Sequence, residues 1–149
     1  MTRSLPSVTL VRRIKASPAK VWAAITQPDR MLQWWGPDAG PTLSVEADVR
    51  LGGRFSIVFR LLNGDEHNPT GVYREVVPER KLVFTWEWPG MPERESLVTF
   101  LLTPRDEGVE LTLIHEQLPD DGARASHAAG WSGLLDKLAV FLGESRWAT

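Results

Sequence analysis

The strongest constraint on the fold is an alternation of apolar and other residues that recurs through the middle of the chain. It is clearest in residues 82–88, LVFTWEW. One side of this segment carries Leu82, Phe84, Trp86 and Trp88, and the other side carries Val83, Thr85 and Glu87. Because successive side chains of a β-strand point to opposite faces, the pattern predicts a strand with an aromatic inner face.

Similar segments occur on both sides of this one, and short turns containing Gly, Pro or Asn separate most of them. The predicted strands cover residues 7–15, 42–49, 54–61, 71–77, 82–88, 96–103 and 109–116, with a turn over 104–108. In residues 71–77 the inward set is ambiguous: it is either Tyr73, Glu75 and Val77 or Val72, Arg74 and Val76. Six or seven strands with such short connections are typical of an antiparallel meander.

Three helices are predicted around these strands. Ser17 is a good N-cap and Pro18 suits the first helical turn that follows it. Pro28 ends this helix and can begin a second, which is expected over Asp29 to Trp34. The last helix, capped by Asp120 or Asp121, has a broad apolar stripe made of Trp131, Leu134, Leu135, Leu138, Phe141 and Leu142. This order of elements favours an α+β fold in which the sheet curls around the last helix.

Composition argues against several classes of protein. The net charge is −2 and the longest basic run is Arg12-Arg13, so no nucleic-acid surface is indicated. The apolar run 138–142 is far shorter than the roughly 20 residues of a membrane span, and Met1 to Lys15 has no signal-peptide core. The absence of cysteine excludes disulfides, thiolate metal ligands and a cysteine nucleophile. We therefore expect a cytoplasmic protein without a membrane span or a nucleic-acid partner.

Six fragments of the chain resemble, in order, one known family. They are WWGP (34–37), ADVRLGGRF (47–55), GVYREVVPERKLVFTWEW (71–88), SLVTFLL (96–102), LTLIHEQLP (111–119) and GWSGLLDKLAVFL (130–142). Their pattern resembles the activator-of-heat-shock-ATPase-homologue branch of the START-like superfamily, also called SRPBCC or pollen-allergen-like. The resemblance covers nearly the whole chain. It implies a helix-grip fold, in which a curved antiparallel sheet surrounds a long C-terminal helix, two short helices close one end, and a hydrophobic cavity lies between.

What the resemblance implies about function is broader. Members of the superfamily bind lipids and other apolar ligands, cyclise polyketides, sequester reactive natural products, or stimulate the ATPase of a chaperone. The chaperone activators contain this domain as one part of a longer protein, whereas residues 1–149 are interpreted here as a single START-like ligand-binding domain. We therefore favour ligand binding over a chaperone role in the stress response.

The aromatic residues that are expected to face the interior form either an ordinary core or the walls of a cavity. In a helix-grip fold, Trp34 and Trp35 would lie where the short helices meet the cavity mouth, with one ring packed and the other near the opening. Gly130 and Gly133 flank Trp131 inside a helix, where each glycine costs about 1 kcal/mol relative to alanine, and space for a guest or close packing would offset that cost. The candidate ligand-binding residues are Trp34, Trp35, Phe55, Phe59, Tyr73, Phe84, Trp86, Trp88, His115, Trp131 and Leu135.

His115 is the one candidate for a catalytic group. It is in register with Val109, Leu111 and Leu113 and is predicted to point inward, either as a hydrogen-bonded core residue or as a proton shuttle. Ser132 lacks the spacing of a nucleophile elbow. No cofactor motif is present, and a metal site would require the fold to bring His67 or His127 to His115, so neither a cofactor nor a metal is expected.

Taken together, these features favour a protein that binds a small hydrophobic or aromatic molecule in a cavity between the sheet and the C-terminal helix. His115 or Tyr73 would supply one polar contact to that molecule. Two alternatives remain. One is a cyclase- or hydrolase-type enzyme that uses the same cavity, and the other is a chaperone ATPase-activator-like or regulatory domain that binds a protein partner. The sequence leaves open whether the chain is a monomer or a homodimer.

Overall fold

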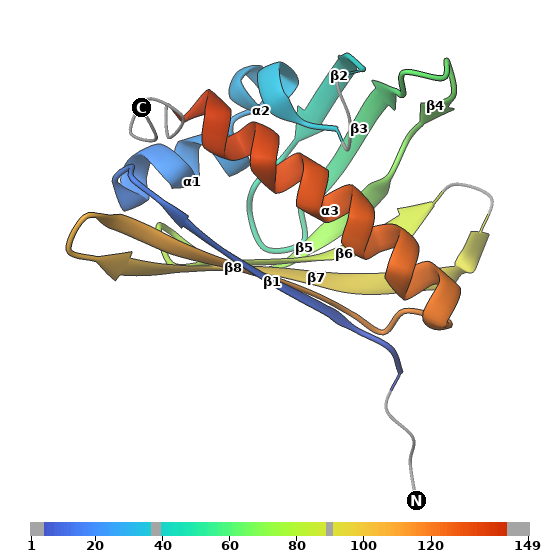
Figure 1. Cartoon of the computed structure of the whole chain (residues 1–149). Helices are drawn as coiled ribbons and strands as arrows, with labels where there is room; N and C mark the ends of the chain where they lie inside the picture. Colours follow the sequence, from blue (N-terminus) through green and yellow to red (C-terminus); the bar gives the residue numbers. More distant parts are fainter. Residues whose placement is uncertain (1–4, 37–39, 89–90, 143–149) are drawn as a thin grey trace, which may run out of the picture.

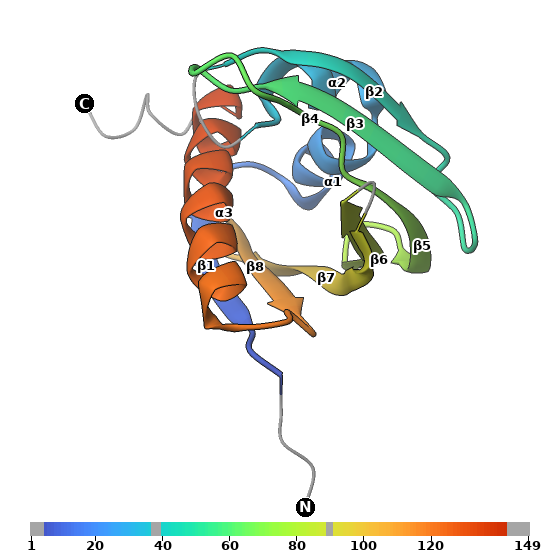
Figure 2. The same ribbon diagram turned by 90° about the vertical axis from the view of Figure 1, so that its right-hand side faces the viewer.

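A curved antiparallel sheet surrounds one long helix in the computed structural model, which describes residues 5–36, 40–88 and 91–142 (Figure 1, Figure 2). Two short helices close one end of the sheet. In chain order the elements are β1 (Val8–Ile14), α1 (Pro18–Thr26), α2 (Pro28–Trp34), β2 (Thr42–Ala47), β3 (Arg54–Arg60), β4 (Glu66–His67), β5 (Thr70–Val77), β6 (Lys81–Trp88), β7 (Met91–Arg105), β8 (Gly108–Glu116) and α3 (Asp121–Phe141). The predicted α+β helix-grip fold is confirmed.

The sheet has the spatial order β1-β8-β7-β6-β5-β3-β2, and all of these neighbours are antiparallel. Strands β5 to β8 form the predicted meander, while β1 from the chain start pairs with β8 through Val8 opposite His115. In the described residues, seven strands form this path, as expected. The two-residue strand β4 was not predicted and pairs with β3 off the path.

The helix ends follow the expected capping chemistry. The Ser17 side chain accepts a hydrogen bond from the Lys20 amide at 3.2 Å, and Pro18 occupies the first helical position of α1. Helix α2 begins at Pro28, the proline that was expected to separate the two helices. At the start of α3, the cap is Asp120 rather than Asp121, because the Asp120 carboxylate accepts from the Ala123 amide at 2.7 Å.

The ambiguity in β5 has a structural cause. The pairing register between β5 and β6 shifts between Tyr73 and Glu75, which marks an irregularity of the β-bulge type. Tyr73 therefore faces the core, as in one predicted set, and Val76 packs against the core, as in the other. Arg74 and Glu75 are exposed. Each predicted alternation is thus correct for only part of the strand.

The strands β7 and β8 extend beyond the predicted bounds. β7 runs from Met91 to Arg105 and β8 begins at Gly108, so the predicted turn over 104–108 is too long. Arg105 and Gly108 still pair with each other as the last rung before the turn. Pro104 was the reason for predicting a turn there. In the structure it lies in β7 opposite Val109, close to the end of the hairpin.

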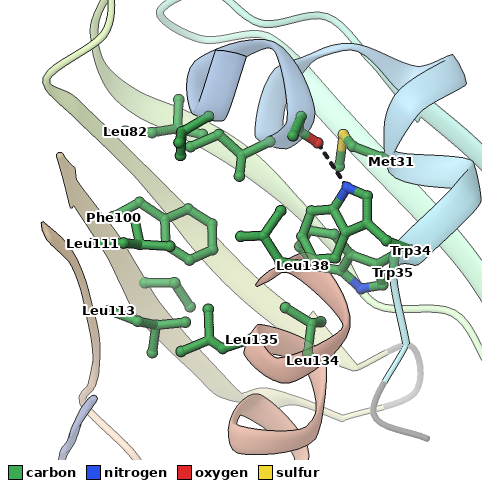
Figure 3. Packing of buried hydrophobic residues seen from close by; sticks show 14 of the residues in the cluster. Met31, Trp34, Trp35, Leu82, Phe100, Leu111, Leu113, Leu134, Leu135 and Leu138 are labelled. Carbon is green, nitrogen blue, oxygen red and sulfur yellow. Dashed lines mark hydrogen bonds between the residues drawn. The ribbon is translucent and has the colours of Figure 1, made fainter. Parts of the chain in front are cut away.

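The core lies between the inner face of the sheet and α3 (Figure 3). Leu135 and Leu138 of α3 are fully buried, as are Leu111 and Leu113 of β8. The predicted apolar stripe of α3 is therefore the face that the sheet covers. Burial of side chains of this size stabilises a fold by about 1.5–3 kcal/mol each.

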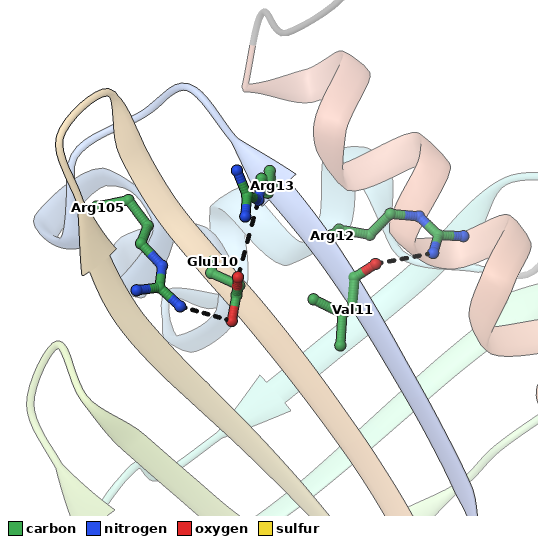
Figure 4. A network of polar contacts seen from close by, with 5 residues as sticks. All are labelled: Val11, Arg12, Arg13, Arg105 and Glu110. Atoms are coloured by element: carbon green, nitrogen blue, oxygen red, sulfur yellow. Dashed lines mark hydrogen bonds and ion pairs between the residues drawn. The ribbon is translucent and has the colours of Figure 1, made fainter.

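The polar contacts around β1 differ between its two faces (Figure 4). On the inner side Arg12 donates to the Ser132 hydroxyl at 3.0 Å and lies 3.5 Å from the Asp136 carboxylate, which ties β1 to α3. On the outer side Glu110 lies between Arg13 and Arg105, at 3.8 and 3.1 Å. Both outer arginines are exposed, so these pairs contribute little to stability. Ser132 thus has a structural partner in Arg12.

Candidate ligand-binding cavity

The first half of α3 and the strands β3, β4 and β6 line a partly open cavity of about 910 Å³. Its wall consists largely of aromatic rings from elements that are distant in the sequence. These rings are Trp35, Phe59, Trp86, Trp88 and Trp131. On the α3 side Gly130 is among the lining residues.

Trp86 lies at the centre of the aromatic wall. Its ring centroid is 5.0 Å from Trp131 and 5.5 Å from Trp88, and the Trp86 and Trp88 planes are perpendicular. Trp35 stacks on Trp86 at a centroid distance of 6.4 Å. Such tilted and edge-to-face arrangements are favourable for aromatic pairs. The rings support one another and form a continuous apolar surface along one side of the cavity.

The two adjacent tryptophans after α2 have different positions. Trp34 is fully buried, and its indole N–H donates to the Ala24 carbonyl of α1 at 3.0 Å (Figure 3). Trp35 is also buried in the core cluster but lines the cavity. Sequence reasoning expected one packed ring and one ring near the opening. Trp34 is the packed ring and Trp35 is the cavity ring.

His115 lies behind the aromatic wall and is completely buried. The Trp131 indole N–H donates to its Nδ1 at 2.8 Å, which assigns the proton of the neutral ring to Nε2. Nε2 then donates to the Ser96 hydroxyl at 2.6 Å, and that hydroxyl donates to the Trp86 carbonyl at 3.3 Å. Burial, reinforced by the neighbouring His127 ring, lowers the pKa of His115 to about 3. His115 therefore has the geometry of the hydrogen-bonded core alternative, with both ring nitrogens bonded.

His127 is the histidine of α3 that lines the cavity. Its Nδ1 lies 2.7 Å from the Ala123 carbonyl, to which it donates, so Nε2 is the unprotonated nitrogen of the neutral ring. The Trp88 indole N–H donates to Nε2 at 3.2 Å. This bond joins α3 to β6 beside the cavity. The ring centroids of His127 and His115 are 4.7 Å apart.

Several predicted site residues lie outside this cavity. Phe55, Tyr73 and Phe84 pack together deeper in the core, where the Phe55 and Phe84 centroids are 5.2 Å apart. Together with Trp35 they border only a small void of about 10 Å³. Burial, with a smaller effect of the Asp48 carboxylate, raises the pKa of the Tyr73 phenol. Leu135 is fully buried and belongs to the core as well.

Trp86 has an unusual polar atom. Its indole Nε1 is buried, and within the described parts of the chain it is the one buried side-chain nitrogen or oxygen without a hydrogen-bond partner. By contrast, the indole nitrogens of Trp34, Trp88 and Trp131 all donate hydrogen bonds. An unpaired buried donor is costly, so packing of the large Trp86 ring must compensate for it.

A family model with the description "Activator of Hsp90 ATPase homolog 1-like protein" matches residues 15–143 of the chain. The chain belongs to this family. The family assignment from the six sequence fragments is thereby confirmed. A search of curated proteins finds no match.

Solved structures agree with this assignment. The AHSA1 protein of Silicibacter pomeroyi is 30% identical, with a TM-score of 0.81 over 94% of this chain and 99% of that chain. CalU16 of Micromonospora echinospora is 26% identical, with a TM-score of 0.71 over 98% of this chain and 85% of that chain. The AHSA1-like protein of Aeromonas hydrophila, 20% identical with a TM-score of 0.81 over 94% of both chains, shows the shared fold.

Several polar residues that line the cavity of this AHSA1-like protein were not among the ligand-binding candidates predicted from the sequence. They are Glu66, His67, Asn68, Asp120, Ser126 and His127. Helical spacing could have indicated His127, since it lies one turn before Trp131 on the same face of α3. The β4 residues gave no such signal, because a two-residue strand has no periodicity. His67 and His127 both contact the Trp88 ring, with centroids 5.8 and 6.0 Å away.

Among the described residues, no helix is both long and apolar enough to cross a membrane. Nor does this part of the AHSA1-like chain contain a group of three or more His, Asp or Glu side chains that could hold a metal ion.

Proposed function

We propose that this AHSA1-like protein binds a small hydrophobic or aromatic molecule in the cavity between α3 and the sheet. The observation that carries the proposal is the wall of five aromatic rings around about 910 Å³. Ligand pockets in proteins typically measure about 300–1,000 Å³ and are lined mainly by apolar and aromatic side chains. The helix-grip fold of the family usually binds hydrophobic ligands, which supports the same function.

The proposal treats residues 1–149 as one ligand-binding domain, active in the cytoplasm as a monomer or homodimer. Within it, Trp35, Phe59, Trp86, Trp88 and Trp131 supply apolar contact with the ligand. Polar contacts are assigned to His127 and Asn68 rather than to His115 or Tyr73, because the first two line the cavity.

An enzyme of the cyclase or hydrolase type is a second candidate, and one observation favours keeping it. Such an enzyme needs a proton-transferring group in the cavity. His127 lines the cavity, and its Nε2, which accepts the Trp88 indole N–H at 3.2 Å, could take up a proton where a ligand displaces that bond. A His127→Gln variant that binds ligand but loses turnover would support this candidate.

A thermal-shift screen tests the binding proposal. The compounds are fatty acids, sterols, flavonoids and polyketide-like aromatics. A ligand present at about 100 times its Kd adds about 2.7 kcal/mol of stability, which raises the Tm of a domain of this size by about 5–10 °C. We expect one aromatic or apolar class to produce such a shift.

Two tryptophan variants assign the shift to the cavity. Trp88→Ala removes a half-buried ring of the cavity wall and should abolish the shift in a folded protein. Trp22→Ala removes a partly buried ring that does not line the cavity, and it should leave the shift unchanged. Binding that survives Trp88→Ala, or no shift from any class, would contradict the proposal and favour a protein-binding role for the outer surface.

A further inference from the structure

The charge of the polar cavity residues restricts the ligand that this site would take. In the described part of the chain, the polar residues that line the cavity are neutral or acidic, and no lysine or arginine is among them. A carboxylate or phosphate group placed among these described residues would meet no lysine or arginine and would lie near the carboxylates of Glu66 and Asp120. The lining therefore disfavours anionic ligands such as fatty acids.

The two acidic residues of the lining differ in their partners. Glu66 is paired with Arg60, whose guanidinium lies 2.9 Å from its carboxylate. Asp120 accepts the Ala123 amide through Oδ1 and forms no ion pair with a lysine or arginine of the described residues. The N-terminus of α3 carries a partial positive charge of about half a unit, which offsets only part of the Asp120 charge. Among the described lining residues, the charge at the α3 end of the cavity is therefore net negative.

The aromatic wall favours the same sign of charge. The faces of tryptophan rings are electron-rich and attract organic cations. Trp86 and Trp88 meet at 90° with centroids 5.5 Å apart, so the face of one ring and the edge of the other form a corner of the wall. Trp88 is only half-buried and lines the cavity, so its surface is accessible to a ligand.

From these observations we infer that the ligand is an organic amine that is protonated at neutral pH. Its apolar or aromatic part lies against the tryptophan wall, and its ammonium group lies toward the Asp120 carboxylate at the start of α3. This inference rests on the proposed ligand-binding function and adds the chemical class of the ligand. For ligands that share the same ring, it predicts that the affinity decreases from the cation to the neutral molecule to the anion.

Three indole compounds of similar size test the inference by calorimetry at low ionic strength: tryptamine, tryptophol and indole-3-propionate. A naphthalene series with the same three end groups repeats the test on a second ring. We expect tryptamine to bind about fivefold more tightly than tryptophol, because Asp120 is exposed and an exposed ionic contact at low ionic strength contributes up to about 1 kcal/mol. Indole-3-propionate should bind least tightly, and added salt should reduce the differences.

Two aspartate variants provide a matched comparison. Asp120→Asn removes the charge but keeps a residue that caps helices equally well, so the fold should be retained. It should make the affinities of tryptamine and tryptophol nearly equal. Asp121→Asn makes the same charge change one residue away, outside the cavity, at a side chain that pairs with Arg124 at 3.5 Å. It should preserve the preference for tryptamine.

The outcomes separate the inference from the proposed function. If the indoles bind to the cavity without a charge preference, or if the preference survives Asp120→Asn, the inference is wrong while the proposed function stands. If no member of either series binds, the proposed binding of aromatic molecules fails as well. A preference for indole-3-propionate would also overturn the inference.

Discussion

His115 illustrates how a single polar side chain is accommodated in this core. Its position on the inner face of β8 follows from the alternation with Leu111 and Leu113 and was predicted correctly. Its partners Ser96 and Trp131 come from β7 and α3, 19 and 16 residues away. Periodicity can indicate which way a residue points but not which distant residue it will meet. The neutral, fully bonded state of His115 therefore required the structure.

The low pKa of His115 predicts a loss of stability in acid. In the unfolded chain this histidine takes up a proton near pH 6.5, whereas in the folded protein it does so only at about 3. Between these values the unfolded state binds the proton, so His115 favours unfolding by about 1.4 kcal/mol for each pH unit below 6.5. The free energy of unfolding is therefore not reduced by His115 above pH 6.5, and the reduction grows progressively as the pH falls toward 3.

Urea unfolding at pH 7 and pH 5 measures this effect. The wild-type protein should lose about 2 kcal/mol more than His115→Gln between these pH values, because the variant has no imidazole to protonate. Equal losses in wild type and His115→Gln would show that His115 does not titrate as its burial requires.

Two tryptophan-to-phenylalanine variants compare paired and unpaired indole nitrogens. Trp131→Phe removes the donor to His115 Nδ1 and leaves a buried acceptor unsatisfied, which costs about 1–3 kcal/mol beyond the loss of ring volume. Trp86→Phe loses the same volume but no hydrogen bond from its side chain to the described residues. We expect chemical denaturation to show Trp131→Phe as the less stable variant. The opposite order would mean that the Trp86 N–H has a stabilising partner.

At the scale of elements, the close approach of β5 to its neighbours depends on Gly71. A Cβ atom at this position would lie 1.9 Å from the Thr85 carbonyl oxygen and 2.5 Å from the Phe55 ring. Because the first of these atoms is backbone, the strands would have to move apart. Gly71→Ala should therefore destabilise the protein by about 1–3 kcal/mol or more, measured by denaturant unfolding.

Gly122→Ala is the matched control for this prediction. It makes the same change in the first turn of α3, where the nearest atom to the added Cβ, Asp120 Oδ1, is 3.4 Å away. Since alanine favours a helix over glycine by about 1 kcal/mol, this variant should be as stable as wild type or more stable. Equal destabilisation by both variants would argue against a tight contact at Gly71.

Local sequence patterns predicted the elements well because each pattern is completed within a few residues. The Ser17 and Asp120 caps, the α3 stripe and the strand alternations are all of this kind. The register shift in β5 could not be predicted, since it arises where Tyr73 and Glu75 adjust to the pairing with β6. The short strand β4 likewise exists only through its pairing with β3.

At the scale of the whole molecule, the fold could be predicted and the cavity only in part. Trp35, Phe59, Trp86, Trp88 and Trp131 were correctly expected to meet around the interior, and they line the cavity. Phe55, Phe84 and Leu135 have the same sequence signal but are core residues. The difference depends on where α3 crosses the sheet, since the helix fills one part of the inner face and leaves the other part open. No pattern within a strand contains that information.

The most direct test of the account is a ¹⁵N NMR titration that follows the indole N–H signals. The titrant is the compound that gives the largest thermal shift. The signals of Trp35, Trp86, Trp88 and Trp131 should shift on binding, because these rings line the cavity. Those of Trp22 and Trp34, which lie outside it, should remain in place. Saturable binding that leaves the four cavity signals unchanged would contradict the assignment of the cavity as the ligand-binding site.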